Sequence, residues 1–357
     1  MTTGLVLSLD AMGGDHAPQS VVDGAALFLK ARRRKVRLLF HGDERVLAPL
    51  IARHDALGGA SEIRHTETEV DMSAKPSEAV RRSRGSSMWN AVHAIKDGEA
   101  QVAVSAGNTG ALMAISKVIL RMKPGVHRPA IAASWPAPTG FSTVLDVGAN
   151  VDCTPSQLVE FAVLGEAFHR AMHGAARPTV GLLNVGQEEL KGSQVIRDAD
   201  ALVRAAGLDM DYRGFIEGDD ISAGTTNVVV TDGFTGNVAL KTAEGTARLV
   251  GGWMREAMTS SLLAKAGAAL LSLGALNQLR ARMDPRNVNG GVFLGLNGVV
   301  VKSHGGTDAA GFGTSLRIAL EMADSAFLSE IETNLSRLAA LEAPGEDGAD
   351  QAQRESA

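Results

Sequence analysis

Short apolar runs alternate with longer helix-like patterns along most of the chain. Each run is rich in Val, Ile and Leu, and the runs are "LVLSLD" (5–10), "VRLLF" (36–40), "QVAVSAG" (101–107), "STVLDVG" (142–148), "TVGLLNVG" (179–186), "VVVTDG" (228–233) and "GVVVKSHG" (298–305). Helical patterns begin at Pro18 and cover 45–54, 111–120 and 155–172. Strands that are apolar on both faces and joined by helices are typical of a largely parallel sheet covered on both sides. The pattern therefore predicts a three-layer α/β/α sandwich.

Polar, glycine-rich loops follow six of the predicted strands. They read "DAMGGDHAP" (10–18), "SAGNTG" (105–110), "DVGANVD" (146–152), "NVGQEELKGS" (184–193), "TDGFTGN" (231–237) and "SHGGTDAAGF" (303–312). In open α/β sheets the ligand lies beyond the carboxyl ends of the strands, where loops lead into helices. We therefore expect these six loops to form one pocket at the rim of the sheet.

Two of these loops, "GNTG" (107–110) and "GFTGN" (233–237), lead from a strand directly into a helical pattern. Glycine lets backbone N–H groups approach a ligand closely, and a helix N-terminus adds a positive potential. The loops thus predict two cradles for a phosphate-sized anion, with side-chain donors at Asn108, Thr109, Thr235 and Asn237. A single glycine-rich loop is explained equally well by a tight turn into a helix. The prediction of an anion site therefore depends on the presence of several such loops.

Composition narrows the function classes. The 357 residues are 45% hydrophobic, enough for a substantial core in one large or two smaller domains. Thirty-five basic and 40 acidic residues give a net charge of -5, which disfavours nucleic acid as a partner. The single cysteine, Cys153, cannot form an internal disulfide, and the N-terminus does not resemble a signal peptide, so we expect a cytoplasmic protein. The longest apolar stretch, 261–276, is shorter than the roughly 20 residues of a membrane span.

Several established signatures are missing from the sequence. It has no G-x-x-x-x-G-K-[ST] motif, no first strand leading into G-x-G-x-x-G, and no G-x-S-x-G elbow. ATP, dinucleotides and a serine nucleophile are therefore disfavoured. His16, His304, Asp15 and Asp308 lie near loop tips without a recognised metal-ligand spacing. The sequence predicts no metal and no cofactor.

Two regions depart from the alternating pattern. Residues 254–286 lose the strand signal and carry five basic and two acidic residues, a local charge of +3. Residues 335–357 are acidic and lack the apolar side chains needed to fold, so we expect a disordered tail.

Seven motifs, in this order, resemble those of the phosphate acyltransferase family usually called PlsX. They are "DAMGGDHAP" (10–18), "AVRRSRGSSM" (79–88), "SAGNTGALM" (105–113), "LDVGANVD" (145–152), "LLNVGQEELKGS" (182–193), "TDGFTGNVALK" (231–241) and "VKSHGGTD" (301–308). The resemblance covers about 5–335. It implies a homodimer with a Rossmann-like α/β/α sandwich, in which 1–334 form the catalytic domain and 254–286 a projecting helical hairpin. The stretch 287–312 departs from the family: it lacks a Tyr before the Gly pair and a Ser-containing segment after the His, so acyl-length selectivity could differ.

The resemblance also implies the reaction. The expected enzyme converts a fatty acyl thioester on acyl carrier protein, plus orthophosphate, into acyl phosphate and free carrier protein, and so supplies a glycerol-3-phosphate acyltransferase in phospholipid synthesis. By motif position, the family's functional lysine and asparagine correspond to Lys191 and Asn237. The alternative readings are a solvated loop charge for Lys191 and a helix cap for Asn237.

Elementary chemistry fits this reaction. Phosphate is already an anion near neutral pH and a thiol with pKa near 8.5 leaves readily, so direct attack without a covalent acyl-enzyme is expected. The demanding tasks are positioning and oxyanion stabilisation. His16 and His304 are secondary candidates for phosphate contact or thiolate protonation. The predicted phosphate- and substrate-binding residues are Asp10, Gly13, Gly14, Gly107, Asn108, Thr109, Gly110, Asn150, Gly233, Thr235 and Gly236.

Partners follow from charge and from the resemblance. Acyl carrier protein is acidic, so a basic patch should receive it, and Arg81, Arg82 and Arg84 are the candidates, with 32–35 as a second cluster. Either cluster is also compatible with an ordinary solvated face. In the predicted hairpin, the apolar residues expected to meet the second subunit or the membrane surface are Leu262, Leu263, Leu270, Leu271 and Leu273.

Three alternatives remain at this point. A phosphotransacetylase acting on short acyl-CoA would use the same phosphate cradle. A non-catalytic anion-binding subunit would bind phosphate without turning over a thioester. A decarboxylating dehydrogenase of similar fold is weakened by the missing dinucleotide and carboxylate-metal motifs.

Overall fold

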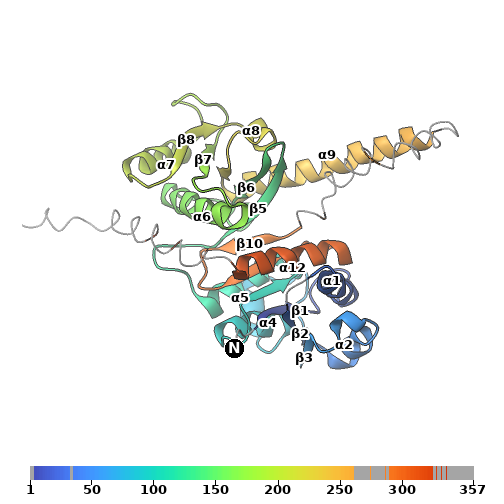
Figure 1. Ribbon diagram of the computed structural model, residues 1–357. Helices are drawn as coiled ribbons and strands as arrows, with labels where there is room; N and C mark the ends of the chain where they lie inside the picture. Colours follow the sequence, from blue (N-terminus) through green and yellow to red (C-terminus); the bar gives the residue numbers. More distant parts are fainter. Residues whose placement is uncertain are drawn as a thin grey trace, which may run out of the picture.

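The structure, a computed structural model, describes residues 4–32, 35–260, 274, 286, 289–324, 327, 331 and 335. Its strands form one 11-stranded sheet in the order β3-β2-β1-β4-β11-β10-β5-β6-β9-β7-β8 (Figure 1). The strands are β1 (Leu5–Asp10), β2 (Val36–Gly42), β3 (Ser61–His65), β4 (Val102–Ser105), β5 (Ala130–Ala137), β6 (Gly140–Leu145), β7 (Thr179–Leu183), β8 (Asp211–Ile216), β9 (Val228–Val230), β10 (Gly291–Leu294) and β11 (Val299–Lys302).

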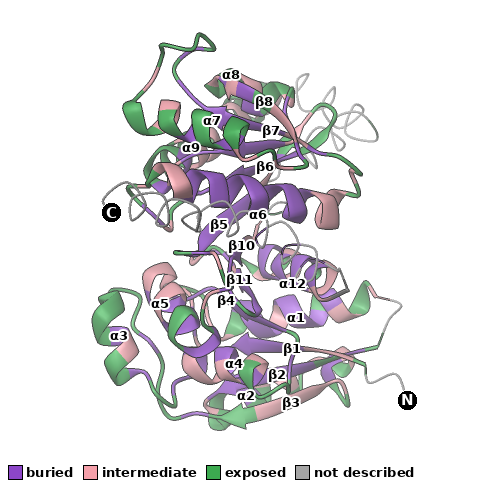
Figure 2. Ribbon diagram, turned by 90° about the vertical axis from the view of Figure 1, so that its left-hand side faces the viewer, coloured by how far each residue is buried: buried purple, intermediate pink, exposed green. Residues whose placement is uncertain are grey.

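Helices cover both faces of this sheet. They are α1 (Gln19–Lys30), α2 (Glu44–Ile51), α3 (Pro76–Arg82), α4 (Ser87–Lys96), α5 (Thr109–Leu120), α6 (Pro155–His173), α7 (Gln194–Ala205), α8 (Gly218–Ala223), α9 (Gly233–Thr259) and α12 (Ala309–Asp324), with a 3-10 turn at Asp55–Leu57. Figure 2 shows that the strands and helix α6 are largely buried while α3 and α7 present exposed residues to solvent. One apolar cluster joins α1, α6, α7 and α12 to the sheet, and another joins α3, α4, α5 and α8 to it. Val102 and Val104 face the first cluster and Ala103 the second, as strand alternation requires. The predicted three-layer α/β/α sandwich is confirmed.

Sheet direction reverses at the centre. Pairings within the strand group β3, β2, β1, β4 and β11, and within the group β6, β9, β7 and β8, are parallel. The central pairings β11–β10, β10–β5 and β5–β6 are antiparallel. The two parallel groups therefore run in opposite directions. The six loops therefore fall into two groups of three. The register of the central strands places Lys302, at the end of β11, level with Val144, near the end of β6, so the two groups approach each other across β10 and β5. A single pocket formed by all six loops stays a prediction.

Local sequence signals explain why the helices begin and end where they do. Helix α6 starts with Thr154, whose hydroxyl accepts from the amide of Gln157 while Gln157 accepts from the Thr154 amide. It ends at Gly174, whose left-handed conformation is the usual helix stop. Between these residues α6 is buried almost throughout, so it forms the middle of its helical layer.

The structure differs from the sequence predictions in two C-terminal regions, the predicted hairpin at 254–286 and the predicted tail at 335–357. Helix α9 begins well before the predicted hairpin at 254–286 and extends away from the body in Figure 1. The five hairpin leucines, Leu262, Leu263, Leu270, Leu271 and Leu273, lie outside the described residues. Leu335, assigned to the tail by sequence, is instead buried with Phe327 and Ile331 at helical spacing in the core, and 336–357 lie outside the described residues. None of the described helices combines the length and apolar character of a bilayer span.

Candidate functional site

Three loops meet at the carboxyl ends of β1, β4 and β11. The amide of Asp15 donates to the carbonyl of Gly305 at 2.9 Å, which joins the first loop to the last. The hydroxyl of Ser105 donates to Oδ2 of the buried Asp10 at 2.6 Å, which joins the first loop to the second. Burial raises the pKa of Asp10, and the hydrogen bond from Ser105 opposes that rise. These predicted loops do form one group.

The glycines of these loops are needed for their mutual packing. A β-carbon at Gly13 would overlap Oδ2 of Asp10 and lie 2.9 Å from the amide nitrogen of Gly107. Gly14 has φ of +117°, a conformation that other residues rarely adopt. We expected these glycines to let the backbone approach an anion. At these two positions the missing β-carbon instead lets the loops pack against each other.

Asn108 begins helix α5 and holds a neighbouring segment. Its Oδ1 accepts from the amide of Ala111 at 2.9 Å, and its Nδ2 donates to the carbonyls of Met72 and Ala74. The side chain that we predicted as a phosphate donor is thus a helix cap and a loop clamp. The first-turn amides at 109 and 110 have no intrahelical acceptor, as at every helix N-terminus, so anion binding at this loop stays a prediction that rests on these amides.

Lys302 is a basic residue of this group that sequence reasoning missed. It ends β11, and its Nζ donates to the carbonyls of Ala106, at 3.2 Å, and Ser303. Burial lowers the pKa of Lys302 to about 8, against the attraction of Asp10 and Asp15. The available signal was a lysine closing the otherwise apolar run "VVVK".

The second group of loops is built around Asp146, at the end of β6. Its carboxylate is fully buried and accepts from the amides of Ile131, Gly148, Ala149 and Asn150 at 2.7–3.1 Å. The Asn150 side chain also donates to it, at 2.8 Å. Burial raises the pKa of Asp146, and these hydrogen bonds oppose the rise. The structure thus gives Asp146 and Asn150 a role in shaping the loop.

The start of α9 packs tightly on this loop. The amide of Gly233 donates to the carbonyl of Asn150 at 2.7 Å, and Asp232 caps the helix by accepting from the amide of Thr235 at 2.8 Å. The amide of Gly236 donates to the carbonyl of Asp232. These three amides already have protein acceptors, so the backbone cradle expected at 233–236 stays a prediction that these amides do not support. An anion here would be held by side chains.

Asn237 is an exposed residue that directly follows the first turn of α9. It is not the helix cap, since Asp232 has that role, and its Nδ2 donates to the carbonyl of Val147 at 3.3 Å. A β-carbon at Gly148 would lie 2.7 Å from this Nδ2. The absence of a side chain at Gly148 therefore lets the side-chain amide of Asn237 pack against the loop that follows β6.

Lys191 lies in the exposed loop between β7 and α7. Its ammonium is 3.9 Å from a carboxylate oxygen of Glu188, and the side chain is half exposed. Asn184 fixes the loop by donating to the carbonyl of Lys191 at 3.2 Å, and Gly192 has φ of +84°. The backbone at Lys191 is thus positioned while its charge remains open to solvent.

A cavity of about 530 Å³ lies between the Lys191 loop and the start of α9. Its lining comes from four segments of the chain that are far apart in sequence: Val151, Asp152, Cys153, Leu158, Leu182, Leu183, Ser193, Val195, Ile196, Val230, Thr231, Asp232, Phe234 and Thr235. Ser193 is two residues after Lys191, and Thr235 is two residues before Asn237. The segments that carry the two predicted catalytic residues therefore border one cavity, although neither Lys191 nor Asn237 is among its lining residues.

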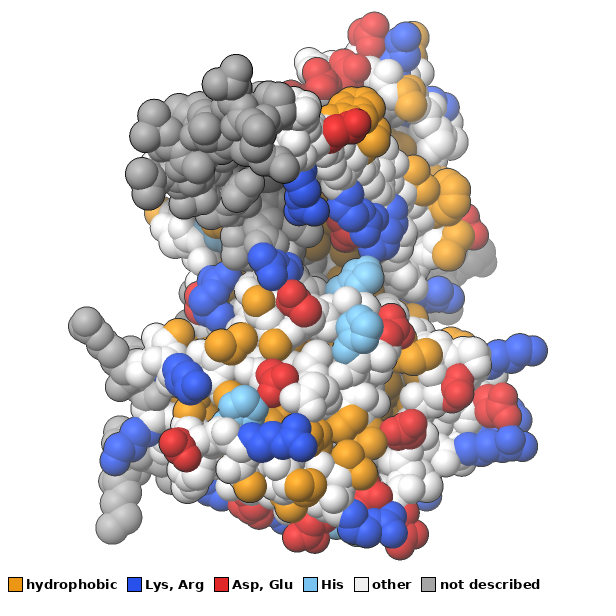
Figure 3. Space-filling model, turned by 90° about the vertical axis from the view of Figure 1, so that its right-hand side faces the viewer, with side chains coloured by type: hydrophobic (Ala, Val, Ile, Leu, Met, Phe, Trp, Pro, Cys, Tyr) orange, Lys and Arg blue, Asp and Glu red, His pale blue; other side chains and the backbone are white. Residues whose placement is uncertain are grey.

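Helix α9 joins the two loop groups. Asn237, Lys241 and Glu244 are spaced to lie on one face of the helix. The Lys241 ammonium lies 3.3 Å from Nε2 of His304, which follows β11, and 2.8 Å from a Glu244 oxygen. Figure 3 shows histidine and basic side chains gathered where this face of the molecule is hollowed. His304 thus takes part in a contact between the loop groups, while His16 is exposed on the first loop.

The predicted carrier-protein patch lies beside the first group. Arg81 and Arg82 end helix α3, which packs against α5, and Arg84 follows it. All three are exposed, although Arg82 pairs with Glu78 at 2.7 Å and Arg84 lies over the Trp89 ring. Of the second cluster, 33–34 lie outside the described residues.

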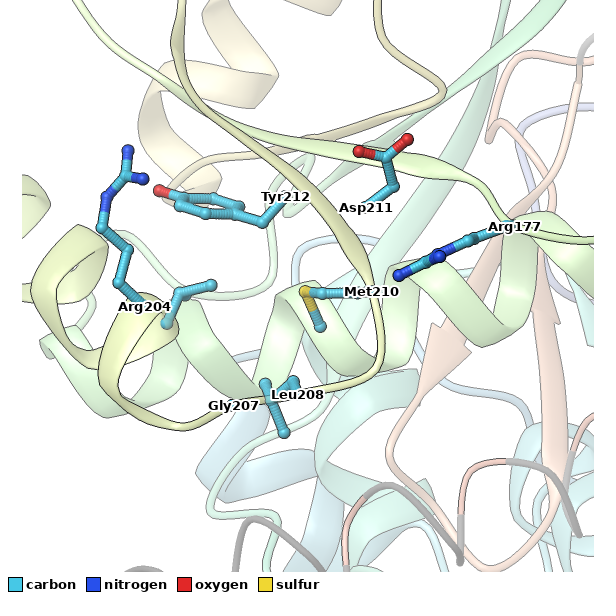
Figure 4. Close-up of a pocket in the computed structure, with 8 residues that line it drawn as sticks. Arg177, Arg204, Gly207, Leu208, Met210, Asp211 and Tyr212 are labelled. Carbon is cyan, nitrogen blue, oxygen red and sulfur yellow. The ribbon is translucent and has the colours of Figure 1, made fainter.

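Another pocket, of about 580 Å³, lies against edge strand β8 (Figure 4). Its polar groups pair with one another: Tyr212 donates to Asp200 at 2.7 Å, Arg204 donates to the same carboxylate, and Arg177 lies 3.6 Å from Asp209. It therefore offers little to a ligand. Among the described residues, no cluster of three or more His, Cys, Asp or Glu side chains is arranged to hold a metal.

Comparison with known proteins finds relatives over nearly the whole chain. Residues 5–330 match the family described as "Fatty acid synthesis protein". A phosphate acyltransferase of Maricaulis maris is 64% identical over 343 residues, covering 96% of this chain and 98% of that protein. A phosphate acyltransferase of Caulobacter vibrioides is 55% identical over 356 residues, covering 97% and 98%.

Solved structures share the fold at low identity. The EutD phosphotransacetylase from Staphylococcus aureus aligns with a TM-score of 0.59 at 18% identity, covering 90% of this chain and 94% of that one. A 4-hydroxythreonine-4-phosphate dehydrogenase from Klebsiella pneumoniae aligns with a TM-score of 0.54 at 13% identity, covering 90% and 100%. These likenesses are consistent with a Rossmann-like sandwich.

Proposed function

The chain belongs to the fatty acid synthesis protein family and is an acyltransferase of phospholipid synthesis, and from this premise we propose its substrates and mechanism. The donor is a fatty acyl thioester of acyl carrier protein, the acceptor is orthophosphate, and the products are acyl phosphate and free carrier protein. The observation that carries the proposal is the cavity bordered by both the Lys191 loop and the first turn of α9.

The reaction is a direct displacement at the thioester carbonyl. A phosphate oxygen forms the new bond to the carbonyl carbon, the C–S bond breaks, and the thiolate leaves and takes up a proton from solvent or a nearby acid. Charge develops first on the carbonyl oxygen, so catalysis consists of holding phosphate in place and stabilising that oxyanion. The Lys191 ammonium and the Asn237 amide supply donors of the required kind.

The polar residues at the carboxyl ends of β1, β4 and β11 help to bind phosphate. Lys302, Lys241 and the first-turn amides of α5 place positive potential near the ends of β4 and β11. His304 lies within this field as a hydrogen-bond partner for phosphate. Burial and the nearby Lys241 lower its pKa, so at neutral pH the ring is neutral, and the leaving thiolate takes its proton from solvent.

Charge also favours an acidic carrier protein. Arg81, Arg82 and Arg84 stand exposed beside the loop that Asn108 clamps to 72–74. A carrier docked on them would have its acyl thioester near the strand ends. Homodimer formation and membrane contact through 254–286 belong to the same proposal and rest on sequence alone.

The test is to incubate purified protein with palmitoyl acyl carrier protein and orthophosphate and to measure acyl phosphate and free carrier thiol. We expect the two products in equal amounts, with no acyl group left on the protein in mass spectra. Product from acetyl-CoA but not from long-chain carrier thioesters would instead favour a phosphotransacetylase. Phosphate binding without any thioester turnover would favour the non-catalytic subunit.

A further inference from the structure

The cavity between α7 and α9 has an apolar interior. Leu158, Leu182 and Val230 in its lining are 3%, 1% and 1% exposed, so the cavity reaches down to the core. Val151 and Phe234 are 68% and 62% exposed at the other extreme. The lining thus includes apolar side chains both at the solvent-exposed mouth and next to the core, as ligand-binding cavities commonly do.

Three polar side chains of the lining, those of Asp232, Thr235 and Ser193, already have partners within the protein. Asp232 accepts from the amide and hydroxyl of Thr235 at 2.8 and 2.9 Å. Ser193 caps α7 by accepting from the amide of Ile196. The carboxylates of Asp152 and Asp232 also disfavour a second anion inside the cavity. The deep part of the cavity, at Leu158, Leu182 and Val230, is apolar and would be covered best by an apolar group.

We infer that this cavity holds the alkyl chain of the fatty acyl group and so sets acyl-length preference. The inference rests on the proposed function. The carbonyl end of the chain would lie at the mouth, between the Lys191 loop and the first turn of α9, and the methyl end would lie against Leu158 and Leu182. Each methylene that enters the cavity should raise kcat/KM roughly fourfold until the space is filled.

Filling the cavity tests the inference through chain length. Ile196 lines it from α7 and is only partly buried, so Ile196→Trp adds volume there. We expect kcat/KM for palmitoyl carrier thioester to fall at least tenfold, and that for octanoyl thioester no more than about threefold. Leu202→Trp on the same helix is the matched control, because Leu202 is 45% exposed and does not line the cavity.

Should Ile196→Trp fail to fold, Val195→Trp repeats the test, since Val195 lines the cavity and is 36% exposed. A loss of the same factor for both chain lengths would overturn the inference while leaving the proposed function intact. Absence of acyl phosphate from wild-type protein at every chain length would instead overturn the proposed function itself.

Cys153 provides a readout that needs no turnover. It is the single cysteine of the chain and lines the cavity. Burial raises its pKa to about 12, so alkylation by N-ethylmaleimide at pH 8 should be slow and should depend on access. We expect hexadecylphosphonate to slow labelling at least fivefold by intact mass, and inorganic phosphate or butylphosphonate to leave it unchanged. Equal labelling rates with and without hexadecylphosphonate would contradict a chain in this cavity.

Discussion

The ammonium of Lys241 lies 3.3 Å from Nε2 of His304, across 63 residues of sequence. Nδ1 of the same ring lies 3.2 Å from the amide of Gly306, a second donor. A neutral imidazole accepts at one nitrogen only, so one of these contacts at a time is a full hydrogen bond. Both neighbours favour the neutral ring, and together they tie α9 to the loop after β11.

The first prediction concerns the charge on His304. Burial and the Lys241 ammonium lower its pKa, so Lys241→Met should raise that pKa towards the ordinary value near 6.5. The change can be followed by NMR titration of the ring. Arg248→Met, an exposed change on the same helix, is the control. An unchanged His304 pKa in Lys241→Met would mean that the contact is absent in solution.

The second prediction concerns pH and Lys302. Its pKa of about 8 lies below the ordinary 10.5, so the residue is charged below pH 8 and loses that charge above it. If the charge helps to hold phosphate, turnover should fall up to about tenfold per pH unit above 8. Lys302→Arg, whose guanidinium stays charged, should move this fall to higher pH. A wild-type rate that is flat from pH 8 to 10 would exclude this role.

The same shift has a consequence for stability. Because the pKa of Lys302 is lower in the folded than in the unfolded chain, the unfolded chain binds more protons between pH 8 and 10.5. The free energy of unfolding should therefore rise across that window, relative to Lys302→Met. Denaturant titrations of both proteins at pH 7.5 and 10 measure the difference.

Much of the fold could be predicted from sequence because its strand–loop–helix units are local. The run at 102–120 gives β4, the Asn108 cap and α5 with no help from distant residues. The reversal of the sheet could not be predicted in the same way, since β10 pairs not only with the adjacent β11 but also with β5, which is far from it in sequence. One local signal was overlooked: Ala137 and Gly140 flank a two-residue turn, and Gly140 has φ of +130°.

For the candidate site, too, local features could be predicted from sequence and features formed by distant segments could not. The loops bearing Lys191 and Asn237 could be located by motif, but the cavity that they share could not, because its lining comes from distant segments. Sequence also could not decide whether a glycine in these loops makes room for an anion or for a close contact within the protein. At Gly13 and Gly236 the missing β-carbon serves contact with Asp10 and Asp146 of the protein itself.

The third prediction concerns the two motif residues. Lys191→Ala and Asn237→Ala should each lower kcat by about 10²–10³-fold, the usual cost of one oxyanion donor. Both side chains are exposed, so thermal unfolding should change little. Lys96→Ala, an exposed lysine at the end of α4, controls for loss of a positive charge. Near wild-type rates in either variant would remove that residue from the mechanism.

The fourth prediction concerns Asp146 as the centre of its loop. Asp146→Asn replaces one acceptor oxygen by a donor, facing amides of residues such as Ile131 and Ala149 that are held at 3.0–3.1 Å. Leaving a buried donor unsatisfied costs about 1–3 kcal/mol, so the free energy of unfolding should fall by at least that much. Asp209→Asn makes the same change in charge at an exposed side chain. Equal stabilities would show that the loop rearranges around the amide.

The fifth prediction compares two glycines of α9. A β-carbon at Gly236 would overlap the carbonyl oxygen of Asp146, whereas one at Gly245 would meet no atom within 4 Å. Alanine is favoured over glycine inside a helix by about 0.8–1.0 kcal/mol, so Gly245→Ala should stabilise the protein by up to that amount. Gly236→Ala carries the same helical gain, but it must push α9 away from β6 and with it Asn237 from Val147. We therefore expect Gly236→Ala to lower both the free energy of unfolding and kcat, and Gly245→Ala to leave kcat unchanged. If both variants were more stable and equally active, the close contact between α9 and the loop after β6 would not exist in solution.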